Sequence, residues 1–165
     1  VHALGRDARL PGVAEAGHRD LGRGRGHVTV GLDDERGVVP ELQPDLPLVR
    51  GDPNLLQQVL MNLLSNAKDA MPLGGRVRIS SRISPKENGA VVVEVEDEGT
   101  GIQAGIIDKI FHPFFTTKEV GKGTGLGLSV SYGIVRSQGG DLRVSSREGA
   151  GAVFSVILPA DDPRG

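Results

Sequence analysis

The stretch DPNLLQQVLMNLLSNAKDAMPLGG, residues 52–75, limits the possible folds of this chain more than any other. It opens with an aspartate that can cap a helix and a proline suited to the first helical position, and it closes with a proline and two glycines that end a helix. Between these ends, apolar side chains recur at helical spacing and form one wide face. The face comprises Leu56, Val59, Leu60, Leu63, Leu64, Ala67, Ala70 and Met71. A helix with such a face must pack against a second layer of structure.

Two β-hairpins are predicted downstream. Residues 76–84 and 90–97 alternate between apolar and polar side chains on either side of an Asn-Gly turn, and residues 141–146 and 152–159 do so around a glycine-rich turn. A second helix is predicted over residues 126–140, ending at two glycines. Strands interleaved with a few helices favour an α+β fold in which helices cover one face of a mixed β-sheet.

The remaining stretches are less regular. Residues 27–32 alternate like a short strand, whereas the proline-punctuated residues 38–51 predict a connector. Residues 98–124 have little periodicity and many glycines, so we expect a long functional loop with a short helix around residues 104–110.

Composition bounds the number of domains and the partners. With 165 residues, 38% of them hydrophobic, the chain is long enough for one domain with a core and too short to count on two. A net charge of −2 offers no basic surface to nucleic acid, and no apolar run approaches the roughly 20 residues that cross a bilayer. The absence of cysteine suits a reducing compartment. We therefore expect a cytoplasmic domain at residues 27–160, without nucleic-acid or membrane contact, between a poorly ordered or degenerate leader at 1–26 and a tail at 161–165.

The glycine loop, GKGTGLGL at residues 121–128, has a glycine at every second position. The dinucleotide fingerprint G-x-G-x-x-G fails in every frame, and the protein-kinase glycine loop fails with it because the spacing is the same. The P-loop pattern G-x-x-x-x-G-K-[ST] fails because Lys122 is followed by Gly123. The loop still leads into a helix N-terminus, whose N–H groups favour an anion. Phosphate binding and a plain flexible linker both fit this stretch taken alone.

Asp97 lies at the end of a predicted strand. Counting by twos from Val91 through Val93 and Val95 places it on the apolar side of that strand. An acid before a glycine-rich turn is most often an ordinary turn former, but a buried carboxylate is costly unless some group donates to it. The exocyclic amine of adenine is such a donor, whereas the O6 oxygen of guanine would be repelled.

Asn62, Asn66 and Asp69 share a narrow stripe along the edge of the first helix's apolar face. An asparagine side-chain oxygen is a hard, neutral ligand suited to Mg²⁺, which is commonly bridged to nucleotide phosphates. Asn66 is therefore the candidate metal ligand. A solvated surface position is the alternative.

The stretch FHPFFTTK, residues 111–118, holds three of the four phenylalanines of the chain. A plug of the hydrophobic core is one interpretation. The other is a mobile lid that docks its aromatic rings when a nucleotide binds and brings Lys118 or Lys122 near the terminal phosphate.

In order, NLLSNAKDAM, DEGTGI, FHPFFTTK and GKGTGLGLS resemble the N, G1, F and G2 boxes of the ATP-binding catalytic domain of bacterial sensor histidine kinases. The match covers about residues 46–159, and the PFFTTK form looks like the nitrogen-regulation class of these kinases. The resemblance implies the Bergerat fold, a two-layer α/β sandwich shared with gyrase, Hsp90 and MutL-type ATPases, and it implies ATP and Mg²⁺ as cofactors.

The resemblance also assigns roles by position. Asn66 would coordinate Mg²⁺ and Asn62 would support the phosphates, while Asp97 would accept from the adenine amine and Gly99 and Gly101 would make room for the base. The other nucleotide-binding residues that the four boxes imply are Asp69, Ile102, Phe115, Thr117, Lys118, Gly121, Lys122, Gly123, Thr124, Gly125, Leu126 and Gly127. Asn62 and Lys118 are the expected catalytic residues.

Asn62 bears on the choice between phosphoryl transfer and hydrolysis. The ATP-hydrolysing members of this superfamily carry a glutamate there as general base, whereas an asparagine cannot take a proton at neutral pH. We therefore expect a protein-histidine kinase in which positioning and metal electrostatics provide most of the catalysis. A nucleotide-binding regulatory module without transferase activity and a hydrolytic ATPase are the alternatives.

The resemblance also implies partners, because a complete kinase of this family has a dimerisation domain that carries a phosphoacceptor histidine. Neither His2 nor His18 lies in the sequence context of a phosphoacceptor. We therefore expect the acceptor histidine on a separate dimerisation domain and a response regulator as an indirect partner. Whether the full-length parent is anchored to a membrane is left open.

Overall fold

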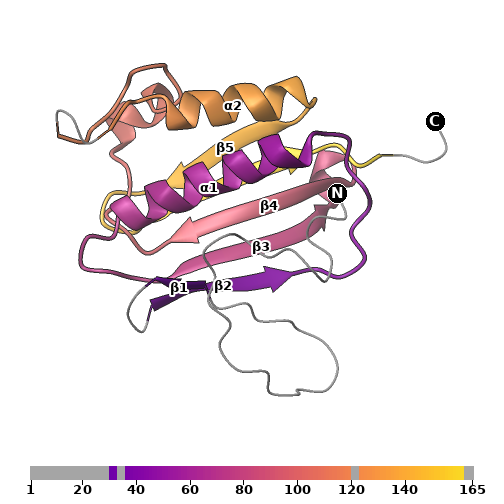
Figure 1. Ribbon diagram of the computed structural model, residues 1–165, viewed down its shortest axis with the longest axis horizontal. Helices are drawn as coiled ribbons and strands as arrows, with labels where there is room; N and C mark the ends of the chain where they lie inside the picture. Colours follow the sequence, from indigo (N-terminus) through magenta and orange to yellow (C-terminus); the bar gives the residue numbers. More distant parts are fainter. Residues whose placement is uncertain (1–29, 33–35, 120–122, 162–165) are drawn as a thin grey trace.

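The computed structural model describes residues 30–32, 36–119 and 123–161. In this part of the chain, six strands form one sheet in the order β1-β2-β3-β4-β6-β5 (Figure 1). The strands are β1 (Val30–Leu32), β2 (Arg36–Leu42), β3 (Val77–Ser84), β4 (Ala90–Asp97), β5 (Asp141–Ser146) and β6 (Ala152–Leu158). The pairing of β2 with β3 is parallel and the other pairings are antiparallel, so the sheet is mixed as predicted.

Two helices lie side by side over one face of this sheet (Figure 1). They are α1 (Pro53–Asp69) and α2 (Gly127–Ser137), and two short 3-10 helices, η2 (Pro85–Glu87) and η3 (Ala104–Lys109), lie in the loops. The two-layer α+β architecture is therefore confirmed. No helix in the described residues is long and apolar enough to cross a membrane.

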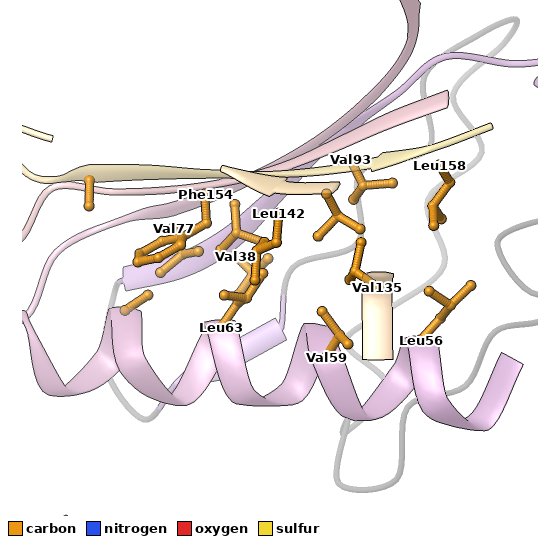
Figure 2. Close-up of a cluster of buried hydrophobic side chains, with 14 of the residues drawn as sticks. Val38, Leu56, Val59, Leu63, Val77, Val93, Val135, Leu142, Phe154 and Leu158 are labelled. Atoms are coloured by element: carbon orange, nitrogen blue, oxygen red, sulfur yellow. The ribbon is translucent and has the colours of Figure 1, made fainter. Parts of the chain in front are cut away.

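Helix α1 forms where its ends and its apolar spacing predict. The carboxylate of Asp52 accepts the N–H of Asn54 at 2.8 Å and so caps the first turn, and Pro53 occupies the first position. Val59 and Leu63 are completely buried between the helix and the sheet. Figure 2 shows side chains of α1 pointing toward those of the strands across this layer. Burial of each such side chain contributes roughly 1.5–3 kcal/mol.

The prediction of a connector over residues 38–51 is wrong for its first part, because residues 36–42 form β2. Val38 is buried there and pairs with Val77 of β3. Pro40 obscures the strand in the sequence, since proline cannot donate a ladder hydrogen bond. The described pairing of β2 with β1 runs from Arg36 to Val38 and stops before this proline.

Several sequence predictions fall at the limits of the described chain. The leader at residues 1–26, together with Gly121 and Lys122 of the glycine loop, lies outside the described residues. The first residue of the predicted tail, Asp161, is bound to the domain: its N–H donates to the oxygen of Leu48 at 2.6 Å, and its carboxylate accepts from Arg50 at 2.7 Å.

Candidate functional site

Hydrogen bonds join three of the predicted stretches around helix α1. Asn62 of α1 donates its side-chain amide to the Gly127 oxygen at 3.4 Å, at the start of α2. The loop after β4 joins the end of α1, where the Thr100 N–H donates to the Ala70 oxygen at 3.0 Å. These contacts place the polar stripe of α1, the end of β4 and the first residues of α2 around one region.

Asp97 is buried, as the strand register predicts, with 5% of its surface exposed. Burial raises the pKa of its carboxyl, while the N–H groups of Gly99 and Ala152 act in the opposite direction and the charge of Glu96 adds to the increase. One oxygen, Oδ1, accepts the Gly99 N–H at 2.8 Å. A carboxylate has about four lone-pair sites, so Asp97 can accept further donors from a ligand.

A close contact within the protein explains why position 101 is a glycine. Its φ is +68°, and a Cβ atom there would lie 2.1 Å from the carbonyl oxygen of Arg147. The loop after β4 therefore needs glycine to lie against the β5–β6 turn. The nearby Ile102 is fixed by its N–H, which donates to Ser146 Oγ at 2.9 Å. That Gly99 and Gly101 make room for a base stays a prediction.

The two asparagines of the stripe differ in their contacts. Asn62 Nδ2 also donates to Ser131 Oγ at 3.2 Å, so this amide holds α1 against α2. Asn66, one turn further along α1, is half-buried, and its side chain makes no hydrogen bond to another described residue. Both polar atoms of the Asn66 amide thus lack a hydrogen-bond partner among the described residues, whereas Asn62 has its Nδ2 engaged and only its Oδ1 available to a ligand.

Lys118 contacts the third member of the stripe. Its Nζ lies 2.5 Å from Asp69 Oδ2, and its backbone N–H donates to Thr116 Oγ1 at 3.1 Å. A Cβ atom on Gly123 would lie 3.0 Å from Lys118 Cδ, so the lysine stem runs past the first described residue of the glycine loop. The structure therefore brings Asp69 and Lys118 together, while Thr117 is exposed beside them.

The three phenylalanines of the 111–118 stretch divide into two groups. Phe111 and Phe115 pack against the core, and the Phe111 ring centroid lies 5.4 Å from that of Tyr132 in α2. Phe114 is 75% exposed and has a φ of +66°, a backbone conformation that residues other than glycine rarely adopt. The core interpretation is therefore correct for Phe111 and Phe115 and not for Phe114.

The first turn of α2 has backbone N–H groups that no side chain caps. Leu126 precedes the helix and provides no side-chain cap, and its own N–H donates to Thr124 Oγ1 at 3.3 Å. Gly125, with a φ of +65°, accepts the Phe114 N–H at 2.9 Å. The first N–H groups of α2, beginning at Gly127, carry the positive end of the helix dipole.

Two contributors were missed by the sequence interpretation. Ser131 is fully buried and accepts from Asn62, and Ser146 links the Ile102 N–H to the Gly151 oxygen. The sequence could have predicted the role of Ser131, because this residue shares a helical face with Leu128 and Val135. A polar residue on such an apolar face needs a hydrogen-bond partner. Nothing in the sequence indicated the role of Ser146, since it ends an alternating strand.

Comparisons with known proteins agree with this arrangement. The family model described as "Histidine kinase-, DNA gyrase B-, and HSP90-like ATPase" matches residues 51–162. Sensor kinase CckA of Brucella abortus (strain 2308) is 48% identical over 127 residues, which cover 70% of this chain and 13% of CckA.

Solved structures give the same result. The catalytic domain of histidine kinase ThkA has a TM-score of 0.63 and 35% sequence identity, with 76% of this chain and 79% of that chain covered. Full-length ShkA in complex with AMPPNP has a TM-score of 0.65 and 26% identity, with 78% of this chain and 27% of that chain covered.

The chain spans 13% to 26% of the length of CckA and similar curated relatives. The likeness therefore concerns one domain of longer proteins. The chain belongs to the histidine kinase-, DNA gyrase B- and HSP90-like ATPase family and is homologous to the ATP-binding catalytic domain of sensor histidine kinases.

Proposed function

We propose that this domain binds Mg-ATP and transfers the γ-phosphoryl group to a histidine on a separate dimerisation domain, from which a response regulator receives it. The observation that carries the proposal is the contact of Asn62 with the start of α2, because it places the stripe of α1 beside the uncapped helix N-terminus. Asp97, buried at the end of β4, supplies an acceptor in the same region. We place this activity in the cytoplasm, where ATP is available.

Different residues of the site would bind the base and the phosphates of the nucleotide. Asp97 would accept the exocyclic amine of adenine, and the first N–H groups of α2 would lie against the phosphates. The AMPPNP complex of the neighbour ShkA supports an adenine nucleotide as the ligand class.

The residues also fit Mg²⁺. Asn66 offers a half-buried, neutral oxygen, and the described residues contain no group of three or more His, Cys, Asp or Glu side chains that could hold a metal alone. Mg²⁺ suits such a site because it usually keeps several waters and takes its other ligands from substrate phosphates. When bound, it would neutralise charge on the phosphate oxygens.

The chemistry of these side chains favours transfer of the γ-phosphoryl group to a histidine over hydrolysis. The bond between the γ-phosphorus and the bridging oxygen breaks, a bond to an imidazole nitrogen forms, and ADP leaves with the electron pair. Asn62 cannot remove a proton from water, so the stripe contains no general base at that position. Among the described residues, Lys118 offers a cation that can approach the transferred group, and the domain acts mainly by positioning.

The test is phosphorylation in trans. The chain is mixed with the dimerisation domain of its own parent protein and with ATP labelled at the γ-phosphate, and acid-labile phosphohistidine is measured over time. We expect the wild-type chain to place the label on the histidine and the Asn66→Ala variant to place none. Tight ATP binding without phosphohistidine would contradict the proposal in favour of a regulatory module, and phosphate release above background would contradict it in favour of a hydrolase.

A further inference from the structure

An ion pair joins two segments of the candidate site. Lys118 Nζ lies 2.5 Å from Asp69 Oδ2, and the two residues are 49 positions apart in the sequence. Asp69 is the last residue of α1, whereas Lys118 is the last residue of the 111–118 stretch. The pair therefore fastens the loop after η3 to the end of the helix.

The position of this pair relates it to the phosphate region. Asp69 lies three residues after Asn66 on the same stripe of α1. The stem of Lys118 runs past Gly123, from which the chain continues to the N-terminus of α2. The ammonium group is thus held between the stripe and the segment that begins α2.

The ion pair is weak enough for Lys118 to leave Asp69 and bind a phosphate group instead. The Asp69 side chain is 47% exposed and that of Lys118 is 36% exposed, so the attraction is screened by water and weak. A terminal phosphate carries more charge than a carboxylate and forms stronger charge-assisted hydrogen bonds with an ammonium group. A carboxylate left facing a polyphosphate would instead repel it.

We infer that the Asp69–Lys118 ion pair is a latch opened by the terminal phosphate of the nucleotide. Asp69 positions Lys118 while no nucleotide is bound, and the ammonium group then moves to the phosphate. Asp69 competes with the nucleotide for Lys118 instead of contacting the nucleotide itself. This inference rests on the proposed function, since it needs ATP in the site.

A double-mutant cycle on ATP binding tests the latch. Calorimetric titrations with ATP and with adenosine are made on the wild-type chain, Asp69→Asn, Lys118→Met and the double variant. Asp69→Asn is expected to increase ATP affinity about threefold, the size of effect typical of a partly exposed ion pair, with adenosine affinity unchanged. The increase must be smaller in the Lys118→Met background, because the competition is then absent and only repulsion is relieved.

The outcomes separate the latch from the function. An equal increase in both backgrounds would overturn the latch, since Asp69 would merely repel the nucleotide. A loss of ATP affinity in Asp69→Asn would also overturn it, because Asp69 would then contact the nucleotide or its metal. A wild-type chain that binds no ATP would overturn the proposed function and the latch together. Lys68→Met is the control, because it removes an exposed positive charge next to Asp69. Asp69→Asn should increase ATP affinity as much in the Lys68→Met background as in the wild type.

Discussion

Asn62 and Ser131 join the two helices of the outer layer: the Asn62 amide donates to Ser131 Oγ at 3.2 Å, and Ser131 is completely buried. Replacing the serine by alanine removes the hydroxyl and leaves the half-buried Asn62 amide with one acceptor fewer. We expect Ser131→Ala to lower the free energy of unfolding by about 1–3 kcal/mol, measured by urea denaturation.

The same helix offers a matched control for that change. Ser137 Oγ donates to the Ile134 oxygen at 2.7 Å on an exposed part of α2. Ser137→Ala should change stability by less than about 0.5 kcal/mol. Equal losses in the two variants would show that the Asn62 contact does not hold the helices together.

Gly125 tests the backbone contact that precedes α2. Its φ is +65°, and a Cβ atom would lie 2.4 Å from the carbonyl carbon of Phe114. Gly125→Ala should therefore destabilise the domain by at least about 1 kcal/mol. Gly133, inside α2 with nothing within 4 Å of its Cβ position, is the control. Gly133→Ala should stabilise by roughly 0.5–1 kcal/mol, and the account of this turn fails if the two variants behave alike in thermal unfolding.

The pKa of Asp97 predicts a pH dependence. Burial raises this pKa above its ordinary value of 3.8, so the native state binds the proton more tightly than the unfolded state does. The free energy of unfolding of the wild type, relative to Asp97→Asn, should fall as the pH rises from 3.8 through the native pKa and then become constant. Urea denaturation across this range measures it. A relative stability that rises with pH would contradict the assigned burial.

Local pattern was enough to predict α1, both hairpins and the burial of Asp97. Helix caps, apolar spacing and alternation are all encoded within a few neighbouring residues, and Asp97 follows from counting along one strand. Strand β2 was missed because its parallel partner β3 lies beyond α1 and Pro40 interrupts its pattern. Long-range pairing decides such a strand, and a single stretch of sequence does not contain it.

Side-chain partners were harder to predict than the positions of the candidate residues in the fold. The stripe of α1 and the residue Lys118 were both recognised. The chain returns to Asp69 through residues 98–118, which have little periodicity, and the two residues are 49 positions apart, so their contact was not predicted. Gly101 shows a related difficulty. Glycine there relieves contact with Arg147 within the protein, and the sequence does not distinguish that reason from room for a ligand.

Asn66 should control the metal dependence of nucleotide binding. Its amide is half-buried and makes no hydrogen bond to another described side chain or backbone group. Asn66→Ala is therefore expected to leave the fold intact and to remove the increase in ATP affinity that Mg²⁺ produces. Titrations with ATP in the presence and absence of Mg²⁺ measure this difference. A variant with the metal dependence of the wild type would contradict the assignment.

The most direct test of the nucleotide site is a calorimetric titration of wild-type chain and Asp97→Asn with ATP and with GTP. We predict that the wild type binds ATP and discriminates against GTP, and that the substitution weakens ATP binding by at least about tenfold, because a hydrogen bond to a charged group contributes roughly 1.5–3 kcal/mol. Glu98→Gln, at an exposed carboxylate paired with Arg76, should bind ATP as the wild type does. Unchanged ATP affinity in Asp97→Asn, or equal affinity of the wild type for ATP and GTP, would contradict the account.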